Sequence, residues 1–355
     1  MTSDSYRFEE INPALYSDQI LRLWREASVA GGLMWQDRSP EPMKLYEGWG
    51  SQPARLFGAW SGDHLVASSV LVPHFAATGV DGEEFQFIYD TDLCVSPAHR
   101  QIGVLLGLLD FRHKIVFSEM SESLREKSIF YGLSHRPDLG KILVRRFVKK
   151  TKVWGCSLGQ SVLAEFACRQ QAAGKPASSF AVSRNIKVPS DVPNFIIPIG
   201  RWNERHLSAI ENATESFSQF CDSKVGISGF LCDFRSTRKM RWNKRAQRLL
   251  SGVAENDEVK YLIGTFTEGS YSVDSVELQE VVHQLLQFAN NCGYDFLAIR
   301  DLPAATLESV RSEGLKVTTF ARDLFAWGFE PSRSHGLPLV QKLASGRIQV
   351  EGLFL

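Results

Sequence analysis

Several features that would assign a protein to a class at once are missing from this sequence. The six cysteines form no CxxC pair and none has a histidine at zinc-ligand spacing, so neither a zinc site nor a disulfide framework is expected. No apolar run approaches the roughly 18 residues that a membrane span needs. Lys plus Arg and Asp plus Glu both number 40, and this zero formal net charge argues against a general binder of nucleic acids or membrane surfaces.

The start of the chain, MTSDSYRFEE, is polar and acidic, unlike a secretory signal. Together with the free thiols and the neutral charge, this predicts a soluble cytoplasmic protein without a metal. The chain has 355 residues, which exceeds the size of one typical core, so two domains are expected.

Hydrophobic periodicity predicts alternating strands and helices in both halves of the chain. In the first half, strands are expected at 6–11, 54–60, 64–75, 84–95, 128–134 and 150–158, and helices at 18–28, 101–120 and 138–147. In the second half, strands are expected at 194–199, 259–266, 294–300 and 315–328, and helices at 204–220, 237–252, 274–293 and 304–314. The helix at 274–293 is the clearest, because Asp274 can cap its start and Gly293 can end it.

The two halves end with the same order of elements. A strand, a short helix and a strand closing on Trp-Gly occur both in 128–155 and in 294–328. This order predicts a diverged tandem repeat. We expect a first domain at 1–168, a linker at 169–193 that is rich in Ala, Ser, Pro and Gln, and a second domain at 194–355.

The stretch VSPAHRQIGV (95–104) joins a strand to a helix with almost no loop. The free N–H groups and the dipole at a helix N-terminus bind anions. Gly103 allows a ligand to approach the backbone, Arg100 adds a positive charge, and Pro97 stops the strand. These residues predict a phosphate or diphosphate site. The alternative is that Arg100 is a surface charge and Gly103 only fits a tight turn.

The surrounding LCVSPAHRQIGVLLGLLD (93–110) resembles the central motif of the Gcn5-related N-acetyltransferase (GNAT) superfamily. The matching positions are Val95, Pro97, Arg100, Gly103 and Leu108-Leu109. The resemblance implies an α/β (α+β) fold of two GNAT-like modules. Each module would have a mixed, mostly antiparallel central sheet flanked by helices, and only the first would carry the cofactor motif.

The resemblance also implies acetyl-CoA or another acyl-CoA as co-substrate. Its pantetheine arm would pair with the strand end formed by Leu93, Cys94 and Val95. Its diphosphate would be bound by Arg100, Gln101, Ile102, Gly103, Val104 and Leu105. The sequence departs from the family pattern at Leu105, where a small residue is preferred. It departs again at Ser134-His135 and Ile142, where Pro-Asn and the usual acidic tyrosine would stand.

Acyl transfer to an amine needs a base for the ammonium proton, and an acid can protonate the leaving thiolate. Asp90 and Asp92 stand two apart on a strand, so we expect them on one face of the sheet, where burial of two like charges would raise one pKa. Tyr131 and His135 are the candidate acids. The alternatives are that Asp90 and Asp92 lie at a solvated strand end, that Tyr131 is a core aromatic, and that His135 is simply exposed.

The aromatic segments GGLMWQD and LYEGWG lie where the resemblance places the acceptor pocket, which makes Trp35, Tyr46 and Trp49 candidate lining residues, with Met34 beside them. Core packing explains them equally well. The second half has no matching R-x-x-G motif, so we expect it to bind no cofactor and to wall the acceptor site. The basic helix expected around 237–248 could guide an anionic substrate or form a solvated face.

The sequence thus predicts an acyl-CoA-dependent N-acyltransferase that acetylates an amine of a small molecule or peptide by direct attack on the thioester. One alternative is a non-catalytic acyl-CoA-binding or scaffold protein with a degenerate GNAT fold. Another is a Fem-type aminoacyltransferase, which would need a nucleic-acid surface that the neutral charge does not favour.

Overall fold

The fold is described from a computed structural model. The structure describes residues 6–29, 34–50, 52–73, 77–78, 84–100, 102–134, 153–170, 177–184, 204–242, 256–266 and 274–329. The helix expected at 138–147 and the strand expected at 194–199 lie outside these ranges.

The first half contains the elements from the N-terminus to the strand that follows the central helix. Its strands are β1 (Arg7–Ile11), β2 (Met34–Asp37), β3 (Arg55–Ser61), β4 (His64–Pro73), β5 (Ala77–Thr78), β6 (Glu84–Val95) and β7 (Ser128–Ser134). Its helices are α1 (Ser17–Val29), η1 (Lys44–Tyr46), η2 (Pro97–His99), α2 (Ile102–Glu119) and α3 (Glu122–Glu126).

The second half repeats this alternation. Its strands are β8 (Val153–Ala167), β9 (Phe180–Ser183), β10 (Ser216–Asp222), β11 (Ile227–Asp233), β12 (Lys239–Trp242), β13 (Glu258–Val259), β14 (Tyr261–Phe266), β15 (Phe296–Arg300) and β16 (Val317–Phe329). Its helices are η3 (Cys168–Gln170), α5 (Glu204–Ala213), α6 (Ser275–Asn291) and α7 (Ala304–Ser312).

One sheet runs through both halves in the order β1-β3-β4-β6-β7-β16-β8-β15-β14-β11-β10-β9, with β5 paired to β6. Most neighbours are antiparallel, but β6 and β7 are parallel, and so are β14 and β15. A parallel pair needs a crossover, which α2 and α3 supply in the first half and α6 supplies in the second. The predicted fold of two modules with mostly antiparallel sheets flanked by helices is confirmed.

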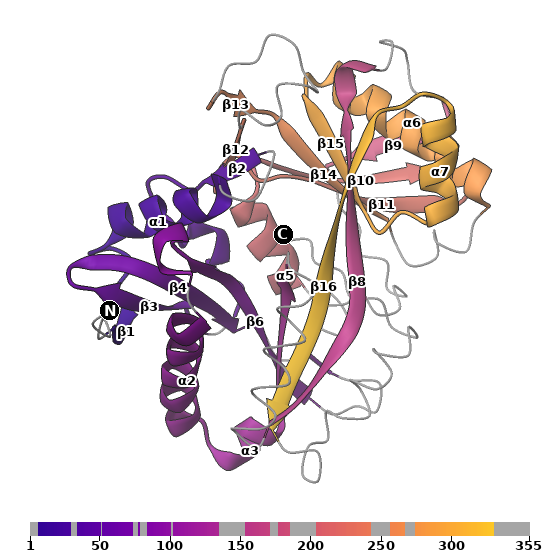
Figure 1. Cartoon of the computed structure of the whole chain (residues 1–355). Coiled ribbons are helices and arrows are strands. Elements are labelled where there is room, and N and C mark those ends of the chain that lie inside the picture. Colours follow the sequence, from indigo (N-terminus) through magenta and orange to yellow (C-terminus); the bar gives the residue numbers. More distant parts are fainter. Residues whose placement is uncertain are drawn as a thin grey trace.

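The two longest strands of the second half, β8 and β16, pair with each other in the middle of the sheet. β16 lies between β7 and β8, and β8 lies between β16 and β15. Figure 1 shows β8 and β16 as two long strands that connect the halves. Part of the predicted linker, β9, pairs with β10 and belongs to the sheet. The domain boundaries at 168 and 194 stay a prediction.

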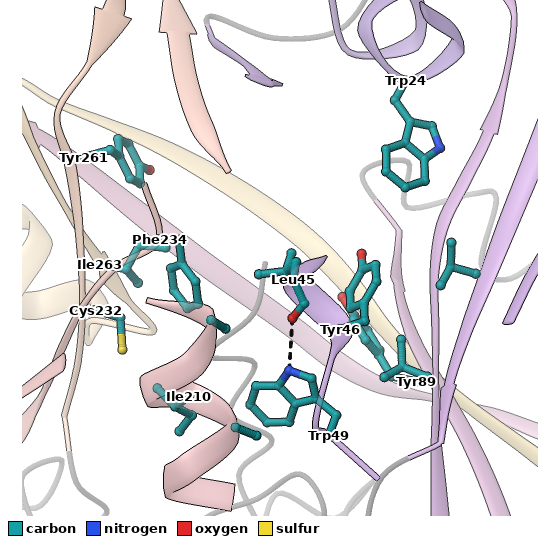
Figure 2. Packing of buried hydrophobic residues seen from close by; sticks show 14 of the residues in the cluster. Trp24, Leu45, Tyr46, Trp49, Tyr89, Ile210, Cys232, Phe234, Tyr261 and Ile263 are labelled. Carbon is teal, nitrogen blue, oxygen red and sulfur yellow. Dashed lines mark hydrogen bonds between the residues drawn. The ribbon is translucent and has the colours of Figure 1, made fainter. Parts of the chain in front are cut away.

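Helices cover both faces of the sheet, with α2 and α6 on one face and α1 and α5 on the other. The apolar side of α2 packs through Val104 and Leu108 on the first half, and α6 packs through Val281 and Leu285 on the second. The opposite face carries one hydrophobic core that both halves share (Figure 2). The face opposite α2 and α6, called the shared face below, therefore joins the two modules.

A small sheet in the order β13-β12-β2 also joins the halves. Its β2 comes from the first half, and the side chain of Arg241 on β12 forms an ion pair of 2.7 Å with Asp37 on β2. The basic helix expected at 237–252 is wrong for its first part, because Lys239–Trp242 forms β12. These residues form a strand because they pair with β2 and β13, and this pairing outweighs their helical propensity.

The helix expected at 204–220 is also too long. α5 ends at Ala213, where the hydroxyl of Thr214 donates to the carbonyl of Ile210 at 2.8 Å. Residues from Ser216 form β10, which pairs with β11 and β9. Hydrophobic periodicity does not show which strands pair, so it could not predict that the helix ends before Ser216.

Candidate active site

The parallel strands β6 and β7 part in the middle of the sheet. Their pairing runs from Gln86 opposite Ser128 to Asp90 opposite Gly132, and no pair follows among the described residues. Beyond this point β6 continues along β4 as far as Val95, while β7 continues along β16. We call this point the strand fork. A Cβ on Gly132 would lie 2.6 Å from the carbonyl oxygen of Asp90, so the fork requires glycine there.

A β-bulge in β6 lies at the strand fork. Thr91 is opposite Val70 and Cys94 is opposite Ser68, so one residue of β4 faces two residues of β6. Asp92 has a φ of 47°, in the left-handed region that few residues other than glycine adopt. The bulge turns Asp92 to the shared face, while Asp90 faces α2. The expectation that the two carboxylates share one face is wrong for this reason.

Asp90 is held in a buried ion pair on the helix side. Both oxygens of its carboxylate accept from the guanidinium of Arg112 on α2, each at 2.7 Å. The same guanidinium donates to the hydroxyl of Ser69. The Asp90 carboxylate therefore anchors α2 to the sheet.

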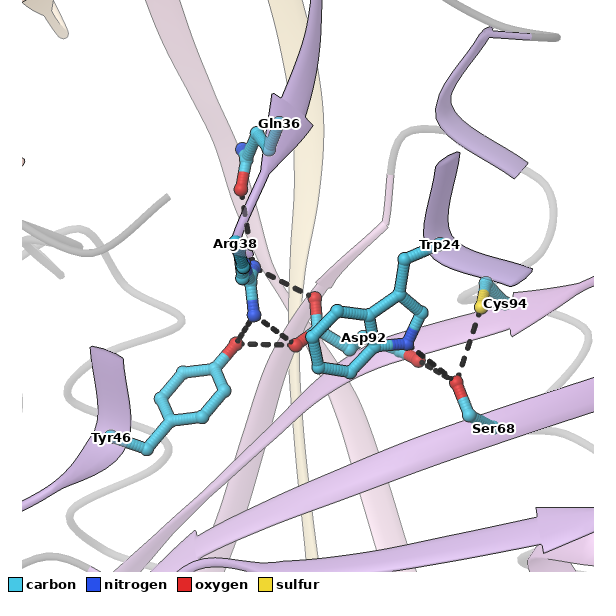
Figure 3. Close-up of polar contacts among 7 residues, drawn as sticks. All are labelled: Trp24, Gln36, Arg38, Tyr46, Ser68, Asp92 and Cys94. Carbon is cyan, nitrogen blue, oxygen red and sulfur yellow. Dashed lines mark hydrogen bonds and ion pairs between the residues drawn. The ribbon is translucent and has the colours of Figure 1, made fainter. Parts of the chain in front are cut away.

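Asp92 is held from the other side by two residues that come before β3 (Figure 3). Arg38 donates to its two carboxylate oxygens at 2.6 and 3.1 Å, and the hydroxyl of Tyr46 donates at 2.5 Å. Arg38 also donates to the side-chain oxygen of Gln36 at 3.1 Å. Burial raises the pKa of Tyr46 well above its ordinary value, so the phenol keeps its proton.

The backbone of Asp92 is fixed as well. Its carbonyl accepts from the hydroxyl of Ser68 at 3.2 Å, and the indole N–H of Trp24 donates to the same hydroxyl at 2.9 Å. The guanidinium of Arg38 lies 4.7 Å from the centroid of the Trp24 ring. Sequence reasoning missed Arg38, Ser68 and Trp24, because nothing in the sequence marks a serine or a tryptophan as a partner of a bulge.

The start of α2 is open to ligands in the described structure. Arg100 and Gly103 are exposed, and a Cβ on Gly103 would meet nothing within 4 Å. The first turn of α2 contains no acidic residue. The protein's own packing therefore does not explain the glycine, and the position suits the close approach of an anion to the helix N–H groups.

Leu105 does not project from this helix start. It is buried and packs with Leu109, and Leu93 and Val95 of β6 pack against the pair. The departure from the family pattern is thus accommodated inside the protein. Cys94 faces the other way, where its thiol lies 3.2 Å from the hydroxyl of Ser68 and burial raises its pKa to about 12.

The other predicted site residues are placed as follows. Val104 is buried in the core beneath α2. Tyr131 is buried and its ring stacks on Tyr89 with centroids 5.1 Å apart, and burial raises its pKa well above the ordinary value. Trp49 is buried and donates its indole N–H to the carbonyl of Leu45 at 3.0 Å (Figure 2).

Four predicted residues have no described side chain. Trp35 pairs through its backbone with Arg241 in the small sheet, and Ile102 begins α2. Gln101 and His135 lie outside the described residues.

Within the described ranges, no helix is both long and apolar enough to cross a membrane. The same part of the chain contains no group of three or more His, Cys, Asp or Glu side chains placed to hold a metal ion.

No protein-family model and no curated protein sequence matches the chain. Among solved structures, the N-myristoyltransferase of Saccharomyces cerevisiae with bound myristoyl-CoA is 8% identical with a TM-score of 0.55, and the match covers 93% of this chain and 85% of that chain. A GCN5-related N-acetyltransferase from Sphaerobacter thermophilus is 12% identical with a TM-score of 0.53, covering 93% of this chain and 98% of that chain. The chain has the GNAT fold, and the resemblance read from the motif is confirmed at the level of the fold.

Proposed function

We propose that this protein is an acyl-CoA-dependent N-acyltransferase whose active site lies at the strand fork. The single observation that carries the proposal is the position of Asp92. A bulge and a left-handed residue turn its carboxylate to the shared face, beside the part of β6 that no described strand covers beyond the fork. The solved relatives named above, one of them bound to myristoyl-CoA, support the same reaction class.

In this proposal the start of α2 binds the diphosphate of the coenzyme. Backbone N–H groups near Gly103 and the charge of Arg100 face the phosphates. The edge of β6 from Leu93 to Val95, which no described strand covers beyond the fork, pairs with the pantetheine arm. The acyl group of the thioester then lies near Asp92.

The transfer itself is a direct displacement. The amine nitrogen attacks the thioester carbonyl, a C–N bond forms, the C–S bond breaks, and the amine loses a proton to Asp92. A carboxylate has about four lone-pair sites, so Asp92 can accept this proton while Arg38 and Tyr46 hold it. We assign Tyr131 as the donor to the leaving thiolate, since it lies on β7 directly before Gly132 at the fork. Asp90 has no part in the transfer, because Arg112 holds it on the opposite face.

Binding of acetyl-CoA and of longer acyl-CoAs tests the first part of the proposal. A ligand at 100 times its Kd should add about 2.7 kcal/mol to the free energy of unfolding. Gly103→Asp places a negative charge at the second residue of α2 and should weaken binding on the order of 100-fold or more. Val276→Asp is the matched control, because Val276 is the exposed second residue of α6, and it should bind as the wild type does.

Turnover tests the second part. Asp92→Asn should keep acyl-CoA binding and lower kcat roughly 100-fold or more, as expected for loss of a proton acceptor. Tyr46→Phe, which leaves the carboxylate in place, should lower kcat less. If acyl-CoA binds and a broad panel of amines is not acylated, the protein is a non-catalytic acyl-CoA binder. If no acyl-CoA changes the unfolding curve, the whole proposal is wrong.

A further inference from the structure

A second polar cluster lies on the shared face, on strands that come from the second half of the chain. Its members are Glu165 on β8, Tyr261 on β14, Arg300 on β15 and Arg322 on β16. Alternation along each strand puts them on the face of the shared core, because Leu163, Ile263, Ala298 and Ala326 on these strands belong to that core. The cluster therefore lies on the same face of the sheet as the Asp92 carboxylate of the first half.

Two arginines in this cluster have donors without a partner among the described residues. Arg300 is 2% exposed, and its Nε and Nη2 atoms are buried with no acceptor there. Its Nη1 reaches only the hydroxyl of Ser161, at 3.4 Å. The Nε atom of Arg322 is buried without an acceptor as well. A buried guanidinium that lacks an acceptor is costly, so these donors indicate a ligand.

The carboxyl groups nearby are engaged elsewhere. Glu165 accepts from the hydroxyl of Tyr261. Asp301 accepts from the backbone N–H of Val162 at 2.6 Å and from the hydroxyl of Ser161 at 3.2 Å. Neither carboxyl group forms a salt bridge with Arg300 or Arg322 among the described contacts. The positive charges of the two guanidinium groups therefore repel each other. Burial, together with the charge of Arg300, lowers the pKa of Arg322.

The charges of the whole layer favour an anion. The arginines are Arg38, Arg238, Arg300 and Arg322, and the carboxylates are Asp92, Glu165 and Asp301. Four cations against three anions leave an excess of one positive charge. Burial raises the pKa of Glu165 to about 7, which removes part of the negative charge near neutral pH. With Glu165 ionised, a carboxylate matches this excess. Protonation of Glu165 near neutral pH raises the excess toward two and strengthens the attraction for an anion.

The cluster lies in the direction in which the strand fork opens. Gly132 at the fork is opposite Phe325 of β16, and Ser134 at the end of β7 is opposite Asp323. Arg322 is the next residue of β16, so it lies past the end of β7, about 10 Å along the strand from the fork. Arg322 is half-buried, so solvent reaches this side of the cluster. Tyr89 is near both the Asp92 carboxylate and this cluster, because the charges of Asp92, Arg322 and Arg300 all act on the pKa of its phenol.

We propose that Arg300 and Arg322 bind a carboxylate of the amine acceptor, so that the substrate class is an amino acid or a short peptide that carries a carboxylate near its reactive amine. This inference rests on the proposed function for the identity of the reaction, but the anion site itself does not. Guanidinium groups suit the site because they can donate two parallel hydrogen bonds to one carboxylate. The second module would then select the acceptor, while the first binds the acyl donor.

The experiment compares the standard amino acids with the carboxamide of each as acceptors for acetyl-CoA. Wild-type protein should prefer the carboxylate on the order of 100-fold in kcat/KM, because the carboxamide leaves buried donors unmatched. Arg322→Met and Arg300→Met, made separately in case one fails to fold, should reduce this preference to less than about tenfold. Arg311→Met is the control, because Arg311 is exposed on α7, on the other side of the sheet, and it should keep the full preference.

Binding of the reaction products gives a readout without turnover. N-acetyl amino acids should bind wild-type protein more tightly than their carboxamides by calorimetry, and Arg322→Met should abolish the difference. Amines acylated without regard to the carboxylate, or phosphonate analogues preferred over carboxylates, would overturn the inference and leave the acyltransferase intact. Failure of every acyl-CoA to bind would overturn the proposed function, and the calorimetric difference would still decide whether the anion site exists.

Discussion

The units β6-α2-β7 and β14-α6-β15 have the same topology, yet they differ wherever a ligand would bind. The start of α2 presents Arg100 and an unhindered Gly103. The start of α6 is closed by its own Asp274, whose carboxylate accepts from the N–H of Val276 at 2.8 Å, and Glu277 lies in its first turn. From these charges we expect the start of α2 to attract an anion and the start of α6 to repel one.

The strands of the two units differ in the same sense. β6 has a bulge and continues five residues beyond its last pair with β7, whereas β14 ends two residues beyond its last pair with β15, Gly264 opposite Ile299. The inward side of α2 carries Arg112, while the inward side of α6 is mostly apolar. The unit β6-α2-β7 has a bulge and a buried arginine, and it leaves a strand edge that no described strand covers. The unit β14-α6-β15 has regular strands and a mostly apolar helix face, and its buried arginine lies on the shared face.

The largest expected effect concerns the ion pair that replaces apolar packing in the first unit. Arg112→Met leaves the Asp90 carboxylate buried without its partner, which should lower the free energy of unfolding by about 3–5 kcal/mol. Urea unfolding followed by circular dichroism measures this loss. The double variant Asp90→Leu/Arg112→Met should recover most of it. If the single variant is as stable as wild type, the pair does not anchor α2.

The next effect is the pH dependence of stability that Glu165 on the shared face should produce. Burial raises the pKa of Glu165 from 4.5 to about 7, so the folded protein binds a proton that the unfolded chain has lost in this range. Stability from this group is therefore complete below pH 4.5 and is lost as the pH rises to about 7, by about 3 kcal/mol in total.

Glu165→Gln keeps an acceptor for Tyr261 and cannot titrate, so its stability should not show this fall. Unfolding free energies of both proteins, measured between pH 4 and pH 8, give the difference. Parallel pH profiles for the two proteins would show that Glu165 does not titrate with a raised pKa.

The contrast between the units also explains what the sequence predicts well. The motif from Val95 to Leu109 predicts a strand, a turn and a helix at adjacent positions, so local rules are sufficient there. The N-cap of α6 by Asp274 follows from residue spacing in the same way. The bulge is different. Ideal alternation places Asp90 and Asp92 together, and only the pairing with β4 shows that an extra residue turns them apart.

Contacts between segments far apart in the chain are equally hidden from local rules. Arg38 meets Asp92 across 54 positions in the chain, and β12 exists because β2 lies beside it. The pairing of β8 with β16 has no local signal either. The strand expected at 315–328 corresponds to β16, but β8 runs nine residues beyond the strand expected at 150–158.

A smaller effect tests the charge at the open helix. Arg100→Ala should weaken acyl-CoA binding about tenfold, since one exposed guanidinium contributes about 1.4 kcal/mol to a phosphate contact. Calorimetric titrations at low ionic strength and at about 1 M salt should show this difference shrinking, because salt screens exposed charges. A tenfold loss that does not depend on salt would mean that Arg100 acts through local structure instead.

The smallest effect concerns the closed helix. Asp274→Ala removes the N-cap of α6, which should lower the free energy of unfolding by about 1 kcal/mol without creating affinity for acyl-CoA. Among the described residues β14 extends only two residues beyond its last pair with β15, so this helix has a much shorter free strand edge beside it, and we expect that removing the acid is not enough to make a site. Titration of the variant with acetyl-CoA, with Gly103→Asp introduced to remove binding at α2, measures the second half alone. Binding recovered in that double variant would show that a free helix start suffices, and that the strand fork is not what distinguishes the two units.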